Sequence, residues 1–306
     1  MKRCIILNPS AGRGKAGRRR HELERALSEA GIDYDLITTH ARGGATELTY
    51  QAVERGYNQI IAVGGDGTLN EIVNGIIGSR KQLHKNASLS IVPLGTGSDF
   101  IKVLDEIRPN DLAGAVRRLS RDQARLVDIG RITVEAGTQK HTRCFINALS
   151  IGIDAQVAVE SLKITKLKGF AVYLLAVIRA LSIYKVHPMT VHFDDHEIQR
   201  RLLFTSVANG RCQGGGFWLT PNALIDDGLF DLCMIDNMRL NEIIQHIPKL
   251  LNGSHTRLRQ VTMGRAQHVT VTSSHPIPVA TDGEVVATDA QRISVEILPG
   301  AIEIII

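Results

Sequence analysis

The pattern of hydrophobic and polar residues differs between two parts of the chain, and the first part is residues 1–124. Short apolar runs in this part predict buried strands, and apolar residues at helical spacing follow each run. Four strands are expected, at residues 3–7, 34–37, 60–63 and 89–92. The accompanying helices are expected at residues 17–30, 45–55, 69–78 and 110–119. Strands that alternate with helices in this way predict a doubly wound α/β domain on a parallel sheet.

From residue 125 onward, short or alternating apolar segments are separated by turn signals, among them Asp226-Asp227-Gly228 and Pro299-Gly300. This pattern predicts a β-rich, β-sandwich-like domain with strands at residues 131–135, 143–148, 190–193, 201–207, 229–235, 269–272, 292–297 and 301–306. A few helices are expected within it, at residues 152–160, 169–184 and 240–251. We therefore expect two domains, residues 1–124 and 125–306, with an active-site cleft between them.

The segment Gly64-Gly65-Asp66-Gly67-Thr68 joins the predicted strand 60–63 to a predicted helix. Backbone N–H groups at such a corner converge on an anion, and glycine allows the anion to approach closely. A carboxylate among these amides would repel a bare phosphate. Asp66 is therefore expected to hold a metal ion or to accept a proton there.

Three other loops follow strands of the predicted parallel sheet and are rich in Gly, Thr or Ser, at residues 8–15, 38–44 and 93–100. Because parallel strands share one carboxyl edge, these loops should meet the glycine turn there, where ligands bind. The loop 8–15 is similar to a P-loop but lacks the G-x-x-x-x-G-K-[ST] pattern. Arg18-Arg19-Arg20 follows it, and both phosphate contact and a solvated basic face account for these cations.

The composition of the 306 residues limits the class of protein. A net charge of +5 and a pI near 9.1 favour anionic ligands or an anionic membrane surface. Nucleic acid would suit this charge, but only 4% of the residues are aromatic and no recognition motif occurs, so we expect no nucleic-acid partner. The four cysteines lack metal-binding spacing, which favours free thiols in a reducing cytoplasm.

The sequence contains no apolar run long enough to span a bilayer, so any membrane contact should be peripheral. The predicted helix 169–184 is nearly all apolar, and Lys163, Lys166 and Lys168 precede it. This segment is either a core helix with a basic lead-in or a basic and apolar lip that touches anionic lipid. The oligomeric state stays open, a homodimer included.

Phosphoryl transfer from a nucleotide needs a phosphate cradle, a metal ion on the phosphates and a carboxylate that takes the acceptor's proton. The glycine turn and the acidic turns of the second half suit this reaction. Five motifs occur in order: Asn8-Pro9 with Gly12, then residues 64–71, 93–100, 226–231 and 282–284. In this order the chain resembles, over nearly its whole length, the diacylglycerol kinase catalytic-domain family and its bacterial lipid kinases. It is more distantly similar to sphingosine and ceramide kinases.

The resemblance implies an ATP-dependent lipid kinase of phospholipid metabolism that phosphorylates the hydroxyl of a diacylglycerol-like lipid at a membrane surface. It implies Asp66, Asp282 and Glu284 as catalytic carboxylates, with Asp66 at the phosphates. Glu284 is favoured over Asp282 as the general base that deprotonates the lipid hydroxyl. The ATP site that the resemblance implies consists of Asn8, Pro9, Ser10, Ala11, Gly12, Thr39, Gly65, Asp66, Gly67, Thr68, Leu69, Asn70, Glu71 and Thr96.

The resemblance also implies a structural Mg²⁺ at the Asp-Gly-Leu turn. Its protein ligands would be the Asp227 carboxylate and the backbone carbonyl groups of Leu224 and Leu229. Few protein ligands and several waters are what Mg²⁺ prefers. Asp99 and Asp128 would link this ion to the nucleotide site.

Two other functions remain open. A soluble small-molecule kinase of the NAD kinase type shares the Gly-Gly-Asp-Gly turn and a two-domain plan, whereas a non-catalytic nucleotide-binding protein would bind ATP without turnover. The loop 95–100 favours a lipid kinase over an NAD kinase. The presence of Asp66, Asp282 and Glu284 argues against a protein that has lost catalysis.

Overall fold

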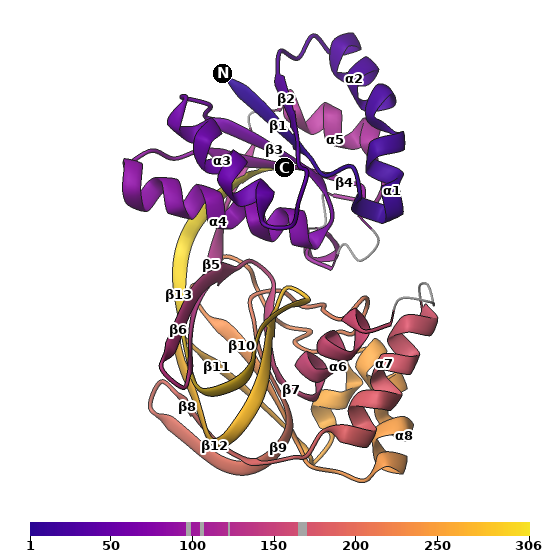
Figure 1. Ribbon diagram of the computed structural model, residues 1–306, viewed down its shortest axis with the longest axis vertical. Coiled ribbons are helices and arrows are strands. Elements are labelled where there is room, and N and C mark those ends of the chain that lie inside the picture. Colours follow the sequence, from indigo (N-terminus) through magenta and orange to yellow (C-terminus); the bar gives the residue numbers. More distant parts are fainter. Residues whose placement is uncertain (96–98, 105–106, 122, 165–169) are drawn as a thin grey trace. The chain divides into compact units, whose positions relative to one another are not determined.

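The computed structural model describes residues 1–95, 99–104, 107–121, 123–164 and 170–306. The chain forms two compact units (Figure 1). Unit 1 comprises Met1–Ile129 and Pro299–Ile306, and unit 2 comprises Gly130–Leu298. The division at residue 124 stays a prediction.

Unit 1 contains a parallel sheet in which β2 (Asp35–Thr38), β1 (Arg3–Leu7), β3 (Gln59–Gly64) and β4 (Ser88–Pro93) lie in that order. The end of β13 (Glu284–Ile305) extends the sheet, because Ile304 pairs in parallel with Leu89. The helices of this unit are α1 (Ala11–Arg18), α2 (Arg20–Glu29), α3 (Gly44–Glu54), α4 (Asp66–Leu83), α5 (Leu112–Leu119) and the short 3₁₀-helix Ile101–Val103. The predicted doubly wound α/β fold is confirmed.

Strands β1, β3 and β4 are buried on both faces, which is why they read as largely apolar runs. On one face, the side chains of Ile5, Leu7 and Val63 pack with Leu23 and Leu27 of α2. Helices α3 and α4 pack together on the opposite face (Figure 1). The sheet therefore has helices on both sides and leaves its carboxyl edge to the loops.

Two local predictions for unit 1 are wrong. The stretch 8–15 is not a plain loop, because α1 begins at Ala11 and its residues Gly12, Arg13 and Gly14 have left-handed backbone angles. Asp66 lies in the first turn of α4 and not before the helix, and α4 continues past Gly78 to Leu83. Packing of α4 against α3, which includes Gly75, outweighs the weak helix propensity of the glycines in α4.

Unit 2 is an antiparallel β-structure in which β11 (Val261–Ala266), β10 (Phe230–Asp236), β9 (His196–Ala208), β7 (Ala148–Gly152), β12 (His268–Thr281) and β13 follow one another. β8 (Pro188–Phe193) bridges β9 and β12, and β6 (Gln139–Phe145) forms a hairpin with β5 (Ala124–Ala136). The helices are α6 (Ile153–Leu162), α7 (Phe170–Ile183), α8 (Leu240–Leu251) and the 3₁₀-helix Ser254–Arg257. The predicted β-rich fold with a few helices is confirmed.

The core of unit 2 lies between its strands. Phe145 and Phe230 are fully buried there, with ring centroids 5.7 Å apart. Aromatic pairs at this spacing stabilise a core beyond the area that they bury.

Two strand assignments in this part are wrong. The segments 292–297 and 301–306 form one strand, β13, of 22 residues. The turn signal Pro299-Gly300 lies inside it, and the Gly300 N–H donates to the Asp128 carboxylate at 2.7 Å. The predicted strand 143–148 divides into β6 and β7, because a carboxylate from a distant turn binds the amides of residues 146–148.

We expect Gly75→Ala to destabilise unit 1. A Cβ at Gly75 of α4 would lie 2.5 Å from Thr49 Cβ and 2.7 Å from the Thr46 carbonyl oxygen on α3. Helices held this closely must separate, so the free energy of unfolding should fall by about 1–3 kcal/mol in a denaturant titration.

Gly78→Ala is the matched control, because the same helix offers open space at that position. Its better helix propensity should raise the free energy of unfolding by about 0.5–1 kcal/mol. Equal effects of the two substitutions would contradict the proposed close packing of α3 on α4.

Candidate functional site

The first part of the candidate site lies at the carboxyl edge of the unit 1 sheet, where the loops after β1 and β3 meet. The Asn8 side-chain amide donates to the Thr68 hydroxyl at 2.9 Å, and its carbonyl oxygen accepts the Ser10 N–H at 3.0 Å. The Asn8 backbone N–H donates to the Val63 carbonyl group at 3.0 Å. Three residues of the predicted ATP site, Asn8, Ser10 and Thr68, are thus brought together.

Glycines let the backbones of three loops touch at this edge. A Cβ on Gly95 would lie 2.4 Å from Gly65 Cα, and a Cβ on Gly12 would lie 2.3 Å from the Leu94 carbonyl oxygen. A Cβ on Gly64 would lie 2.6 Å from the Thr68 hydroxyl oxygen. Real Cβ atoms do not approach other atoms this closely, so the corner exists only with glycine at these positions.

Asp66 belongs to the first turn of α4, beside Gly67 and half-buried. One of its carboxylate oxygens accepts the Asp99 N–H at 3.2 Å, and Asp99 forms an ion pair with Lys102 at 2.8 Å. Asp66, Asp99 and Lys102 thus form one polar cluster at the beginning of a helix. Sequence reasoning overlooked Lys102, which stands three residues after an acidic residue and carries no motif of its own.

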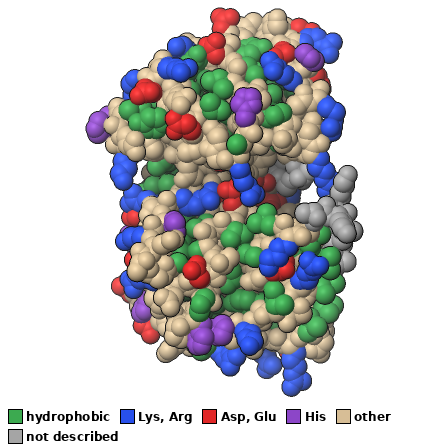
Figure 2. Space-filling model, in the orientation of Figure 1, with side chains coloured by type: hydrophobic (Ala, Val, Ile, Leu, Met, Phe, Trp, Pro, Cys, Tyr) green, Lys and Arg blue, Asp and Glu red, His purple; other side chains and the backbone are tan. Residues whose placement is uncertain are grey.

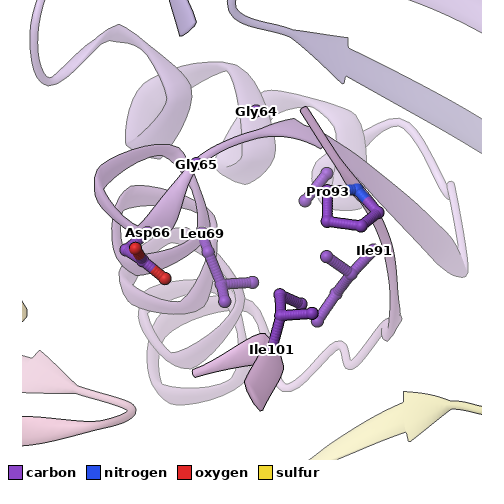
Figure 3. A pocket seen from close by; sticks show the side chains of 8 residues that line it. Gly64, Gly65, Asp66, Leu69, Ile91, Pro93 and Ile101 are labelled. Atoms are coloured by element: carbon purple, nitrogen blue, oxygen red, sulfur yellow. The ribbon is translucent and has the colours of Figure 1, made fainter. Parts of the chain in front are cut away.

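A small cavity of about 10 Å³ adjoins this corner, with Leu69, Ile91 and Ile101 around it (Figure 3). Asp66 lies at its margin. A space of this size holds about one water molecule, so it is not a substrate pocket. Anions would instead meet the exposed side of the corner, where α4 begins with its positive dipole end.

Other residues of the predicted ATP site serve the surrounding fold. Leu69 and Asn70 are buried within the packing of α4. The Glu71 carboxylate accepts the N–H groups of Gly43 and Ala45, each at 2.9 Å, and so caps α3. The Thr39 N–H donates to the Leu7 carbonyl group at 2.9 Å, which extends the pairing of β2 with β1.

The remaining predicted members of this site are Pro9, Ala11 and Thr96. The Pro9 carbonyl oxygen accepts the Gly17 N–H at 3.2 Å, and Ala11 begins α1. Thr96 lies outside the residues that the structure describes.

Two arginines of the basic run pair with acids of α2. Arg19 forms an ion pair with Glu22 at 2.6 Å, and Arg20 forms one with Glu24 at 2.8 Å. The bond to Arg19 lowers the pKa of the Glu22 carboxyl. These surface pairs favour the solvated basic face over phosphate contact for both arginines.

The acidic turn of unit 2 that contains Asp282 is held by backbone amides. Asp282 has a left-handed φ of 49°, and its carboxylate accepts the N–H groups of Ile146, Asn147 and Ala148 at 2.9, 3.0 and 2.9 Å. The Asp282 N–H donates back to the Ala148 carbonyl group. Asp282 therefore ties the turn between β12 and β13 to the junction of β6 and β7.

Glu284 begins β13 two residues later and forms an ion pair with Arg143 of β6 at 3.0 Å. The side chains of Glu284 and Arg143 are 20% and 25% exposed, so solvent and a substrate can still reach the pair. Sequence reasoning overlooked Arg143, because only the pairing of distant strands brings it near Glu284.

The third acidic turn contains Asp227. One of its carboxylate oxygens accepts the Leu229 N–H at 3.1 Å, and the other pairs with the Arg265 guanidinium group. Arg265 also lies 3.5 Å from the buried Asp231, directly opposite on the neighbouring strand. Burial raises the pKa of the Asp231 carboxyl, Arg265 lowers it and Asp227 raises it further.

Mg²⁺ does not fit the Asp227 turn as it stands. Both Asp227 oxygens already accept a donor, and one of these donors is a cation. Within the described part of the chain, no three His, Cys, Asp or Glu side chains cluster, so an ion at this turn would depend on the Asp227 carboxylate, carbonyl groups and water. Leu224 is exposed and Leu229 half-buried, and Arg265 would have to release the Asp227 carboxylate before this turn could hold a cation.

Asp128, the other acid that was expected near the ion, is buried in unit 1 and binds the Gly300 N–H. Asp66, Asp99 and Asp128 thus lie in unit 1, whereas Asp227, Asp282 and Glu284 lie in unit 2.

Comparisons with known proteins match both units. A family model described as the diacylglycerol kinase catalytic domain matches residues 2–132, and one described as the YegS C-terminal NAD kinase beta sandwich-like domain matches residues 147–306. A diacylglycerol kinase of Staphylococcus haemolyticus is 30% identical over 93% of this chain and 83% of its own length. One of Staphylococcus saprophyticus is 29% identical over 92% of this chain and 88% of its own length.

Solved structures share the fold. A diacylglycerol kinase structure from Bacillus anthracis str. Sterne has a TM-score of 0.72 at 22% identity and covers 99% of this chain and 96% of its own. A second structure from this organism reaches a TM-score of 0.77 at 24% identity, with the same coverage. Identities this low show the fold alone. The family models and the relative at 30% identity carry the assignment: the chain belongs to the diacylglycerol kinase family, and it is an ATP-dependent lipid kinase.

Proposed function

We propose that the protein transfers the γ-phosphoryl group of ATP to the hydroxyl of a diacylglycerol-like lipid. The observation that carries the proposal is the corner at the beginning of α4, where the glycine loops after β1, β3 and β4 close around a helix N-terminus. Such a corner binds phosphate through backbone N–H groups and the helix dipole. The catalytic-domain family model covers all of these loops.

In the proposed ATP site, residues 8–12 and 65–68 contact the phosphates, with Thr39 and Thr96 beside them. Asp66 would hold a nucleotide-bound Mg²⁺, and that ion would neutralise the charge that develops during phosphoryl transfer. The bond between Asp66 and the Asp99 N–H supports this role, because it fixes the direction of the carboxylate. Leu69, Asn70 and Glu71 support the site from within α4, Glu71 through the helix that it caps.

In the proposed reaction, Glu284 is the general base. The lipid hydroxyl gives its proton to the Glu284 carboxylate as its oxygen forms the new bond to the γ-phosphorus, and the bond from that phosphorus to ADP breaks. Arg143, which pairs with Glu284, holds the carboxylate in one orientation. Asp282 is a positioning residue, because its three amide bonds fix the turn on which Glu284 stands.

The acceptor lipid is a membrane component, so we also propose that the protein binds membranes peripherally. None of the helices in the described residues combines the length and apolar character needed to cross a bilayer. We also propose a structural Mg²⁺ at Asp227, with the carbonyl groups of Leu224 and Leu229 as further ligands. Binding of this ion requires that Arg265 release the Asp227 carboxylate.

Purified protein with ATP, Mg²⁺ and diacylglycerol in mixed micelles should form a phosphorylated lipid. Asp66→Asn should lower kcat by about 10²–10³-fold, because it removes charge from the phosphate site. The control Asp33→Asn changes an exposed acid of the same unit and should leave the rate unchanged. Phosphorylation of NAD in lipid-free solution would instead favour a kinase of the NAD kinase type. ATP binding without turnover would favour a non-catalytic nucleotide-binding protein.

Glu284→Gln and Asp282→Asn should separate chemistry from positioning. Glu284→Gln removes the proposed base and should lower kcat by about 10²–10⁴-fold with little change in melting temperature. Asp282→Asn removes the charge that three amides bind and should lower the free energy of unfolding by about 1–3 kcal/mol. A Glu284→Gln enzyme with full kcat would refute the assignment of the base.

Arg265→Gln tests the Asp227 turn. The substitution leaves Asp227 next to the buried Asp231 without a cation between them, and the melting temperature should fall. Because Arg265 is 47% exposed, the loss should be about 1–2 kcal/mol.

Added Mg²⁺ should raise the melting temperature of Arg265→Gln more than that of the unmodified chain or of Arg259→Gln, a substitution on the exposed surface of the same unit. If Mg²⁺ raises the melting temperature of none of the three proteins, Asp227 is not a metal ligand. If Mg²⁺ raises all three melting temperatures equally, the ion binds elsewhere.

A further inference from the structure

Helix α8 of unit 2 has more apolar surface than its unit covers. Its apolar residues Leu240, Ile243, Ile244, Ile247, Leu250 and Leu251 recur at helical spacing and form one broad stripe. No residue of α8 is buried. A helix that served only the core would place this stripe against the body of the unit, so the exposure of α8 calls for an explanation.

The stripe divides into a packed half and an exposed half. Ile243, Ile247 and Leu250 are half-buried, and Leu250 packs on the small cluster around Phe204. On the adjoining line of the helix, Leu240, Ile244 and Leu251 are 55%, 58% and 53% exposed. Single exposed apolar residues are common, but three in one line along a helix form a patch.

Two further exposed apolar residues lie on α7, where Ile178 and Ile183 are 56% and 53% exposed. Ile153 of α6 packs both on the cluster that includes Leu250 of α8 and on the one that includes Ala176 of α7, so both helices lie on the same side of unit 2. Figure 1 shows α7 and α8 beside α6 on this side, and Figure 2 shows hydrophobic side chains along the same edge. The exposed residues of α8 and α7 named above, together with Leu162, are called the α7–α8 face.

The exposed charged residues beside Ile178 and Ile183 are cations. The sequence from residue 161 to residue 193 contains no Asp or Glu. Among the described residues, Lys163 forms an ion pair with the buried Glu160 at 2.6 Å, so Arg179 and Lys185 supply the positive charge of this face. Arg179 and Lys185 are exposed next to Ile178 and Ile183. Glu242, an acid on α8, accepts the Arg239 backbone N–H at the helix N-terminus and is half-buried. A partner for this face must therefore offer apolar surface and negative charge.

We propose that the α7–α8 face docks on a bilayer that contains anionic lipid, with its apolar side chains among the acyl chains and its cations at the headgroups. This inference rests on the proposed function, because it names the surface by which the enzyme reaches a lipid acceptor. A second copy of this face is a poor partner, since two basic surfaces would meet. Apolar side chains flanked by cations are the pattern of helices that lie in a membrane interface.

The test measures co-sedimentation of the full chain with phosphatidylcholine vesicles, with and without phosphatidylglycerol. The triple variant Leu240→Ser/Ile244→Ser/Leu251→Ser should bind the anionic vesicles at least about 10-fold more weakly, because it loses the apolar contacts. The double variant Asn241→Ser/Gln245→Ser, on the exposed polar side of α8, is the matched control and should bind normally. Arg179→Gln/Lys185→Gln should abolish the preference for phosphatidylglycerol.

Because all three serine positions are exposed, the triple variant should keep its melting temperature. Its rate on vesicle-borne diacylglycerol should fall with binding, whereas its rate on a short-chain, water-dispersed diacylglycerol should stay unchanged. Vesicle binding without any kinase activity would refute the proposed function and leave this inference intact.

Normal vesicle binding by the triple variant would overturn the inference. A change from dimer to monomer in size-exclusion chromatography, with vesicle binding unchanged, would instead assign the face to contact between copies of the chain.

Discussion

The candidate phosphate site depends on the direct contact of backbone with backbone at the carboxyl edge of the unit 1 sheet. Gly95 approaches Gly65 so closely that a side chain at Gly95 has no room, and Gly12 is held against the Leu94 carbonyl group. Parallel pairing of β1, β3 and β4 brings the three loops to one edge, and glycine then lets them close on the beginning of α4. Amide groups, and not long side chains, thus define this surface.

The same backbone chemistry explains why acidic motif residues differ in their roles. Asp282 binds three amides, Glu71 caps α3, and Asp128 holds the Gly300 N–H. Each of these carboxylates fixes a junction of the chain. Glu284 differs from them because it pairs with a side chain, Arg143, at a partly exposed position. A residue that a family motif marks can therefore build a site without touching the substrate, and only its contacts separate the two roles.

The pattern of apolar residues along the chain predicted the features of the fold that depend on neighbouring residues. Apolar runs predicted the bounds of β1 and, within one residue at each end, those of β2, β3 and β4. The reason is that β1, β3 and β4 are buried and therefore largely apolar. Contacts between residues far apart in the chain could not be predicted from this pattern. Pro299-Gly300 reads as a turn, yet Asp128, 172 residues earlier in the chain, holds Gly300 within one strand. Arg265 faces Asp231 only through the pairing of β10 with β11, and no spacing in the sequence indicates that.

Helix α8 shows a further limit and its physical meaning. The spacing of its apolar residues predicts an amphipathic helix, but it does not predict which half of the apolar stripe the fold covers. Exposed apolar lines promote self-association unless charge opposes it. Arg179 and Lys185 provide that charge beside α7, where no acid occurs from residue 161 to residue 193. The cations that keep two such faces apart in water are the groups that an anionic lipid surface attracts, so one arrangement serves both solubility and docking.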